Sequence, residues 1–254
     1  IQDRNDGFML YSEYGAKISH MTTIIKNSKD VVIRNLYLTG IWEWDDDMAA
    51  NYDDQDWDYF TIETTNGVWL DHLKFDQSYD GLVDVKGGTS NFTLSYLDLD
   101  FQVNDFIRAQ MEYLEENYMN NPNISAATSR YVKLREFLSF EDILEYTSMQ
   151  KKGFNFGNTT MGIGFDTITA TFHHSRFINL ADRLPRLRQG DVHVYNVLQD
   201  NTTLESVRAL INGTGMTLPN QGMVPTEEGA IYYENNKLIN VAEPIKTHQD
   251  SNRD

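Results

Sequence analysis

Short stretches in which apolar and polar residues alternate recur along most of the chain. Such alternation predicts β-strands, because successive side chains of a strand point to opposite faces. The stretches are Ile24–Asn27, Val31–Asn35, Phe60–Glu63, Val68–His72, Leu82–Lys86, Phe92–Tyr96, Ile168–Phe172, His193–Asn196 and Ala230–Asn236. Each is followed by asparagine or another turn-forming residue, which predicts many short strands joined by turns.

The strands recur at the spacing of a repeat protein. Leu70 and Leu94 occupy equivalent positions in two of the stretches, separated by a length typical of one solenoid coil. Asn residues end successive strands, and in a solenoid stacked Asn side chains can hydrogen-bond along the axis. A β-sandwich also has short strands and turns. The pattern favours an all-β fold, a right-handed parallel β-helix (solenoid), over the sandwich.

Two segments interrupt the strands. Residues 44–57 form an acidic, loop-like stretch, and residues 105–150 are expected to be a helical insertion. Apolar residues recur in the insertion at helical spacing, namely Phe106, Ile107, Met111 and Leu114, then Leu134, Phe137, Leu138, Ile143 and Leu144. We interpret these stripes as packing faces.

The domain organisation follows from this pattern. Residues 1–254 are expected to form a single β-helix domain that carries the insertion. Residues 201–254 are expected to be a C-terminal strand and loop region that packs on the β-helix. A helix is predicted over Thr202–Ile211, with Thr202 or Thr203 near its cap.

Composition narrows the range of partners. The 254 residues carry a net charge of -17, from 21 basic and 38 acidic residues, which argues against nucleic acid and against an anionic membrane. The absence of cysteine excludes disulfides and thiolate metal sites. An acidic chain can bind a polyanion where clustered Lys and Arg, or a bound divalent metal, make the site locally positive.

A cationic segment stands out in this acidic chain. It runs from Arg183 to Arg188 with the sequence Arg-Leu-Pro-Arg-Leu-Arg and leads into an alternating strand. Arginine binds carboxylates through a rigid planar fork, so the segment suits a polyanionic ligand.

Together with other motifs, this segment resembles the pectate lyases of polysaccharide lyase family one. The matching motifs are residues 60–72 (FTIETTNGVWLDH), 80–87 (DGLVDVKG), 92–96 (FTLSY), 152–157 (KGFNFG) and 171–174 (TFHH). Their order and spacing match over most of residues 15–196, interrupted by the helical insertion. The family has further chain ahead of residues 14–18, so the chain is interpreted as a fragment or as capped by its first residues.

The resemblance implies a calcium site made of Asp56, Asp58, Asp80 and Asp84. Carboxylates are hard oxygen ligands that suit Ca²⁺. The family often has Glu where this chain has Asp80. The other acidic residues nearby, Asp53, Asp54 and residues 45–47, are interpreted as solvated surface groups.

The resemblance also implies a cationic set. Arg183 would be the catalytic base, Lys152 and Arg188 would act in catalysis and substrate binding, and Lys86 would bind substrate. Lys151 is the rival to Lys152, and a pair of solvated surface lysines is the plain structural alternative. A salt bridge to Asp182 is the corresponding alternative for Arg183.

Other residues of the motifs are interpreted as structural. Arg186 is assigned to the alternate position of its segment. The remaining structural assignments are Trp69, Asp71, His72, His173 and His174.

The implied function is that of a secreted, extracellular and monomeric pectate lyase. Its partner would be polygalacturonate, the acidic polysaccharide of the plant cell wall, cleaved by calcium-dependent β-elimination. Two alternatives stay open. One is a pectin lyase that acts on methylated pectin without calcium, and the other is a non-catalytic β-helix that binds polysaccharide.

Overall fold

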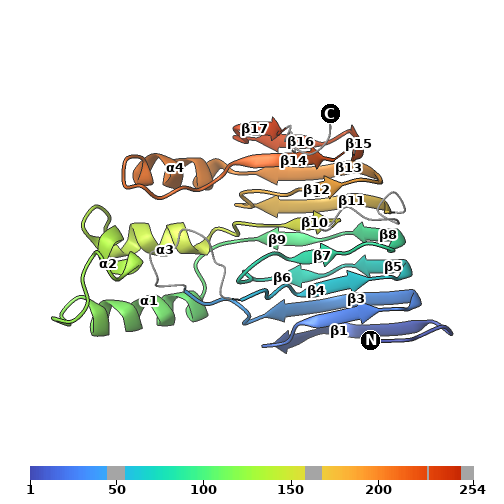
Figure 1. Ribbon diagram of the computed structural model, residues 1–254, viewed down its shortest axis with the longest axis horizontal. Coiled ribbons are helices and arrows are strands. Elements are labelled where there is room, and N and C mark those ends of the chain that lie inside the picture. Colours follow the sequence, from blue (N-terminus) through green and yellow to red (C-terminus); the bar gives the residue numbers. More distant parts are fainter. Residues whose placement is uncertain (45–54, 158–167, 228, 247–254) are drawn as a thin grey trace.

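The alternating stretches form two parallel sheets that run side by side along the molecule (Figure 1). The computed structural model describes residues 1–44, 55–157, 168–227 and 229–246. The larger sheet has the order β1 (Phe8–Ser19), β3 (Lys29–Thr39), β5 (Asn66–Asp71), β8 (Ser90–Ser95), β11 (Thr169–Ile178), β13 (Asp191–Asp200) and β15 (Ala230–Glu234). Three short strands continue its coils, namely β6 (Lys74–Phe75), β9 (Asp98–Asp100) and β16 (Lys237–Ile239).

The second sheet carries the residues of greatest functional interest. Its order along the axis is β2 (Thr23–Lys26), β4 (Phe60–Glu63), β7 (Val83–Val85), β10 (Phe154–Phe156), β12 (Arg186–Arg188), β14 (Gln221–Thr226) and β17 (Glu243–Ile245). Each pair is parallel, and the chain alternates between the two sheets as it climbs. The predicted parallel β-helix is therefore confirmed.

Rows of apolar side chains fill the interior of the coils. Ile33, Leu70, Leu94, Phe172 and Val194 lie in register on five neighbouring strands, and all are fully buried. The predicted equivalence of Leu70 and Leu94 is thus correct. Every coil contributes to one continuous core, as expected for a stack of repeats that cannot bury their apolar faces alone.

A line of left-handed residues marks the bend in each coil of the larger sheet. These residues have φ between 48° and 55° and are Asn35, His72, Tyr96, His174, Asn196 and Asn235. Asn235 donates a hydrogen bond to Asn196, and His174 bonds Asn196 at 3.0 Å. In the middle of the line, the rings of His72 and Tyr96 stack at 4.6 Å. The expected Asn stack therefore exists at one end, while aromatic and imidazole rings replace it elsewhere.

The helical insertion lies between β9 and β10 and projects sideways from the stack of coils, to the left in Figure 1. It contains α1 (Asp105–Tyr118), α2 (Arg130–Arg135) and α3 (Phe140–Ser148). The side chains of Asn104, Ser129 and Ser139 each accept a hydrogen bond from a backbone N–H in the first turn of the helix that follows. The predicted stripes do pack inward, except for Phe106 and Phe137, which are 38% and 58% exposed.

The C-terminal region contributes α4 (Thr202–Ile211) and strands of both sheets. The helix begins at Thr202, as predicted, with Asn201 as its N-cap residue. Leu204 and Val207 of α4 join Ile143 and Leu144 of α3 in a second apolar core. No helix among the described residues has the length and apolarity needed to cross a membrane. The predicted acidic loop of residues 44–57 falls mostly on residues 45–54, including Asp53 and Asp54, which lie outside the described residues.

Candidate active site

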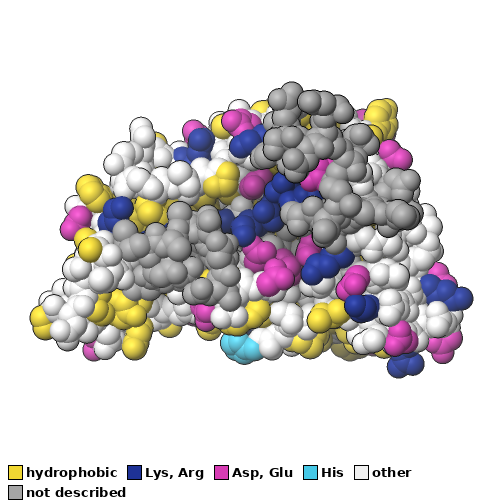
Figure 2. Space-filling model, viewed as in Figure 1, with side chains coloured by type: hydrophobic (Ala, Val, Ile, Leu, Met, Phe, Trp, Pro, Cys, Tyr) yellow, Lys and Arg dark blue, Asp and Glu magenta, His cyan; other side chains and the backbone are white. Residues whose placement is uncertain are grey.

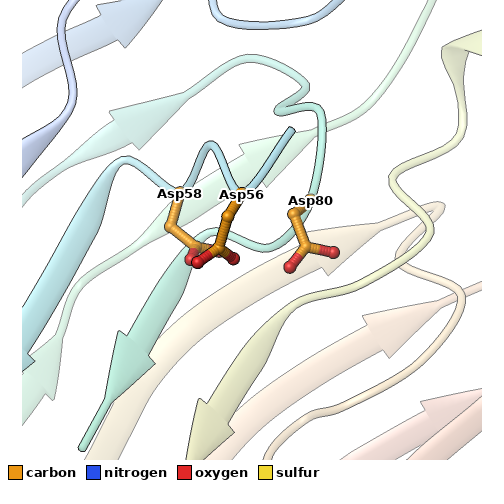
Figure 3. Close-up of side chains that lie close together, drawn as sticks. All are labelled: Asp56, Asp58 and Asp80. Carbon is orange, nitrogen blue, oxygen red and sulfur yellow. The ribbon is translucent and has the colours of Figure 1, made fainter. Parts of the chain in front are cut away.

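Three of the four predicted calcium ligands converge in front of the second sheet. Asp56 and Asp58 come immediately before β4, and Asp80 comes before β7 on the next coil. Each offers a carboxylate oxygen, and these oxygens all lie within 4.8 Å of one another (Figure 3). Stacking of adjacent coils thus brings together residues that are far apart in the sequence.

Asp58 is the buried member of this cluster. It is 4% exposed, and the Gly81 N–H donates to its Oδ1 at 2.8 Å. Burial, together with the charges of Asp80, Asp84 and Asp56, raises the pKa of Asp58 to about 8. A side chain at Gly81 would place Cβ 2.7 Å from the same oxygen, so any larger residue there would displace the Asp58 carboxylate.

Asp84 lies outside the three-carboxylate cluster. It accepts a hydrogen bond from Asn155 Nδ2 at 2.8 Å, and Lys86 Nζ lies 3.6 Å from its other oxygen. Burial raises the pKa of Asp84, and the charges of Asp56 and Asp80 act in the same direction. The fourth predicted ligand therefore belongs to the same electrostatic site, but Asn155 and Lys86 hold its oxygens.

The two adjacent lysines point to different places. Lys152 Nζ forms an ion pair with Asp80 at the edge of the carboxylate cluster. Lys151 Nζ donates to the Tyr146 hydroxyl at 3.2 Å and lies over the ring of that tyrosine, in the insertion. The geometry places Lys152 in the site and Lys151 in the packing of α3.

Arg188 is buried in the same face of the sheet. It is 6% exposed and donates through Nη1 to Asn155 Oδ1 at 2.9 Å and to the Gly157 carbonyl at 3.0 Å. Its Nε lies 3.5 Å from Glu227 Oε1 on the following coil. Burial lowers the pKa of Arg188 to about 10, with the nearby charge of Arg186 acting in the same direction.

Asn155 is a site residue that the sequence did not reveal. Its amide donates to Asp84 and accepts from Arg188, so it joins the acidic and cationic halves of the site. Its place within the motif of residues 152–157 was the available signal. The structure adds that it lies on β10 between Asp84 on β7 and Arg186 on β12.

Arg183 lies just before β12 in an unusual backbone conformation. Its φ is 64°, and its N–H donates to Asp182 Oδ1 at 2.7 Å. Arg183 Nε lies 4.0 Å from Asp182 Oδ2, so the salt bridge considered as the structural alternative is present at long range. The Arg183 side chain is 20% exposed, and its Nε is buried without a hydrogen-bond partner among the described residues.

The assignment of Arg186 to the alternate position of its segment was wrong. Arg186 and Arg188 are two positions apart on β12, so their side chains leave the same face of the sheet. Arg186 is in register with Asn155, which is in register with Asp84. Figure 2 shows Lys and Arg side chains gathered beside acidic side chains on this face.

The histidines of the motifs lie on the other sheet. His72 Nδ1 is 2.7 Å from Asp71 Oδ2, and Arg34 binds the same oxygen at 3.0 Å. His173 and His174 contact each other through their Nδ1 atoms at 2.8 Å. The interpretation of these histidines as structural stays a prediction, and the contacts given are with other side chains of the larger sheet.

The fold places the chain among the parallel β-helix proteins, with a site that combines carboxylates and cationic side chains. Comparison with known proteins identifies the family. The family model described as pectate lyase matches residues 12–136 and 146–252. The chain belongs to this family.

Two curated relatives differ in how much of them the chain covers. Pectate lyase B of Paenibacillus amylolyticus is 34% identical over 261 residues, which cover 98% of this chain and 66% of the relative. A pectate trisaccharide-lyase of Thermotoga maritima is 25% identical over 181 residues, which cover 71% of this chain and 36% of the relative. The chain thus spans less than two thirds of the length of these curated relatives.

One solved structure supports the fold in detail. The pectate lyase from Paenibacillus sp. 0602 superposes with a TM-score of 0.84 at 34% identity, covering 94% of this chain and 56% of that structure. A structure described by its substrate specificity and anti β-elimination mechanism, also of a pectate lyase, superposes with a TM-score of 0.58 at 18% identity. The second likeness concerns the fold alone.

Proposed function

We propose that this chain is a secreted pectate lyase that cleaves polygalacturonate by calcium-dependent β-elimination. The observation that carries the proposal is the convergence of Asp56, Asp58 and Asp80 beside Lys152 on the sheet that also presents Arg188. The family and the names of the relatives support the same reaction.

The carboxylate cluster suits calcium. Three ionised carboxylates this close together repel one another, and this repulsion adds to burial in raising the pKa of Asp58. A bound cation would relieve the repulsion, and Ca²⁺ takes several oxygen ligands in flexible geometry. Asp56, Asp58 and Asp80 would hold the ion, and Asp84 would join them on release from Asn155. Bound calcium supplies positive charge that neutralises a uronate carboxylate.

The cations of the chain would carry the reaction. Arg183, acting as a neutral guanidine, would take the proton from C5 of a galacturonate and afterwards release it to solvent. The C5–H electron pair would form the C4=C5 double bond, and the C4–O bond would break. The leaving oxygen would receive a proton from solvent. Lys152 and Arg188 would stabilise the negative charge that develops on the carboxylate, and Lys86 would bind a neighbouring sugar.

The remaining parts of the proposal concern location and assembly. A cell-wall polymer is met outside the cell, which favours a secreted protein. We further propose that the protein acts as a monomer.

An absorbance assay tests the reaction. The unsaturated ends produced from polygalacturonate absorb in the ultraviolet, so we expect absorbance to rise with calcium present and to stop after chelation. Activity on methylated pectin that survives chelation would instead indicate a pectin lyase. Binding of polygalacturonate without turnover, unchanged in Arg183→Ala, would indicate a non-catalytic binding protein.

A further inference from the structure

A groove of about 780 Å³ adjoins the candidate active site. Its walls come from α4, from the loop that follows this helix, and from the outer face of β12 and β14. Two of its lining residues, Asp182 and Arg186, also border the site, because Asp182 contacts Arg183 and Arg186 is in register with Asn155. The groove is therefore next to Arg183 and Asn155 of the candidate active site.

Three cationic side chains line the groove: Arg186, Arg208 and Lys246. Arg208 is held in place, since its Nε donates to the Leu218 carbonyl at 2.9 Å and its Nη1 to Glu205 Oε2 at 2.6 Å. Lys246 Nζ lies 3.6 Å from Glu243 Oε2. A guanidinium fixed in this way can receive a carboxylate with little loss of side-chain freedom.

The carboxylates that line the groove accept hydrogen bonds from neighbouring groups of the protein. Glu205 accepts hydrogen bonds from Arg208 and from Asn220, both at 2.6 Å. Asp182 accepts from the Arg183 N–H at 2.7 Å, and burial raises its pKa, with Arg183 acting in the opposite direction. These contacts reduce the repulsion that the two carboxylates would exert on an anionic ligand.

The rest of the lining suits a sugar. Asn212, Thr217 and Gln221 supply hydrogen-bonding groups, while Met216 and Pro219 supply apolar surface. Ligand sites of this size combine apolar walls with a few polar groups that orient the ligand. We infer that this groove binds a further uronate unit of the polysaccharide, at a distance from the reacting bond, through Arg186, Arg208 and Lys246. The inference rests on the proposed lyase function.

The test compares a long and a short substrate. In Lys246→Gln, we expect the ratio of kcat/KM for polygalacturonate to kcat/KM for trigalacturonate to fall about five- to tenfold, because one charge-assisted contact to the long chain is lost. Lys246 is the better probe, since Arg208 also anchors the loop through Leu218. Lys237→Gln is the matched control, because Lys237 is an exposed lysine on β16 of the other sheet, and it should keep the wild-type ratio.

The outcomes separate the two proposals. An unchanged ratio in folded Lys246→Gln, with an active wild type, would overturn the groove as a binding site and leave the lyase function standing. A wild type without activity on polygalacturonate would overturn the function itself. In that case, equal binding of polygalacturonate by wild type and Lys246→Gln in calorimetry would also overturn the groove, and weaker binding by the variant would support it.

Discussion

Two neighbouring lysines provide a direct test of which side chain serves the site. Lys152 pairs with Asp80, whereas Lys151 contacts Tyr146. We expect Lys152→Ala to lower kcat/KM by about 10²–10³-fold, the usual cost of removing one group that stabilises developing charge. Lys151→Ala should stay within about threefold of wild type, since its contact is with the packing of the insertion. A large loss in Lys151→Ala alone would reverse the assignment.

The raised pKa of Asp58 predicts how stability depends on pH. Its folded pKa of about 8 lies above its ordinary value of 3.8, so the unfolded chain loses the proton first. The stabilising contribution of the protonated form is complete below pH 3.8 and is lost as pH rises toward 8. With chelator present, we expect the melting temperature to fall by roughly 3–5 °C per pH unit in this window.

Calcium and a single amide variant check this pH dependence by differential scanning calorimetry. Asp58→Asn should make the dependence in chelator shallower, because the amide does not titrate, while Asp84 and Asp182, whose pKa values burial also raises, keep their share. Saturating calcium should raise the wild-type melting temperature at pH 8 by roughly 5–10 °C at a hundredfold excess over Kd, and should raise that of Asp58→Asn much less. A wild-type melting temperature that rises with pH in chelator would contradict the assignment.

Single residues also show the limit of what the sequence reveals about the site. The resemblance predicted Asp56, Asp58 and Asp80 as one group, and the stacking of neighbouring coils does bring their carboxylates together. The offset of Asp84 could not be predicted, because its partner Asn155 follows the long helical insertion and their pairing depends on the register of β7 and β10. Arg186 was misassigned because the start of β12, which decides the face of each arginine, is not visible in the pattern.

At the scale of elements, the helical insertion is tied to the coils through a shared core. Leu144 of α3 is fully buried in the cluster that also contains Leu204 of α4. We expect Leu144→Ala to destabilise the protein by about 2–5 kcal/mol, the range for a buried leucine truncated to alanine. Denaturant unfolding measures this, and Leu210→Ala, at a leucine that is 46% exposed, should cost much less. A loss in Leu144→Ala as small as that in Leu210→Ala would show that α3 does not share this core.

The length of an element decides whether its pattern can be recognised. The strands with a clear alternation, such as β4 and β5, were predicted close to their observed bounds. β6 has two residues and β9 has three, too few to show a period of two. They form because the left-handed residues before them, His72 and Tyr96, turn the chain so that β6 pairs with β3 and β9 pairs with β11.

At the scale of the whole molecule, an acidic protein is proposed to bind an acidic polymer. The net charge of -17 is spread over the chain, whereas Lys152, Arg186 and Arg188 are concentrated on one sheet. Repulsion therefore acts at long range and attraction at short range. Salt screens the long-range repulsion more strongly than the short-range attraction, because the Debye length falls from about 30 Å at 0.01 M to about 10 Å at 0.1 M.

This difference in range predicts the salt dependence of the reaction. At constant free calcium, KM for polygalacturonate should fall roughly two- to threefold between 0.01 and 0.1 M NaCl, with kcat nearly constant. Trigalacturonate carries few charges and should respond less. A KM that rises steadily over the same interval would show that the local cations, and not the net charge, control encounter with the polymer. Initial rates measured at several salt concentrations distinguish these cases, because long-range repulsion and short-range attraction change KM in opposite directions.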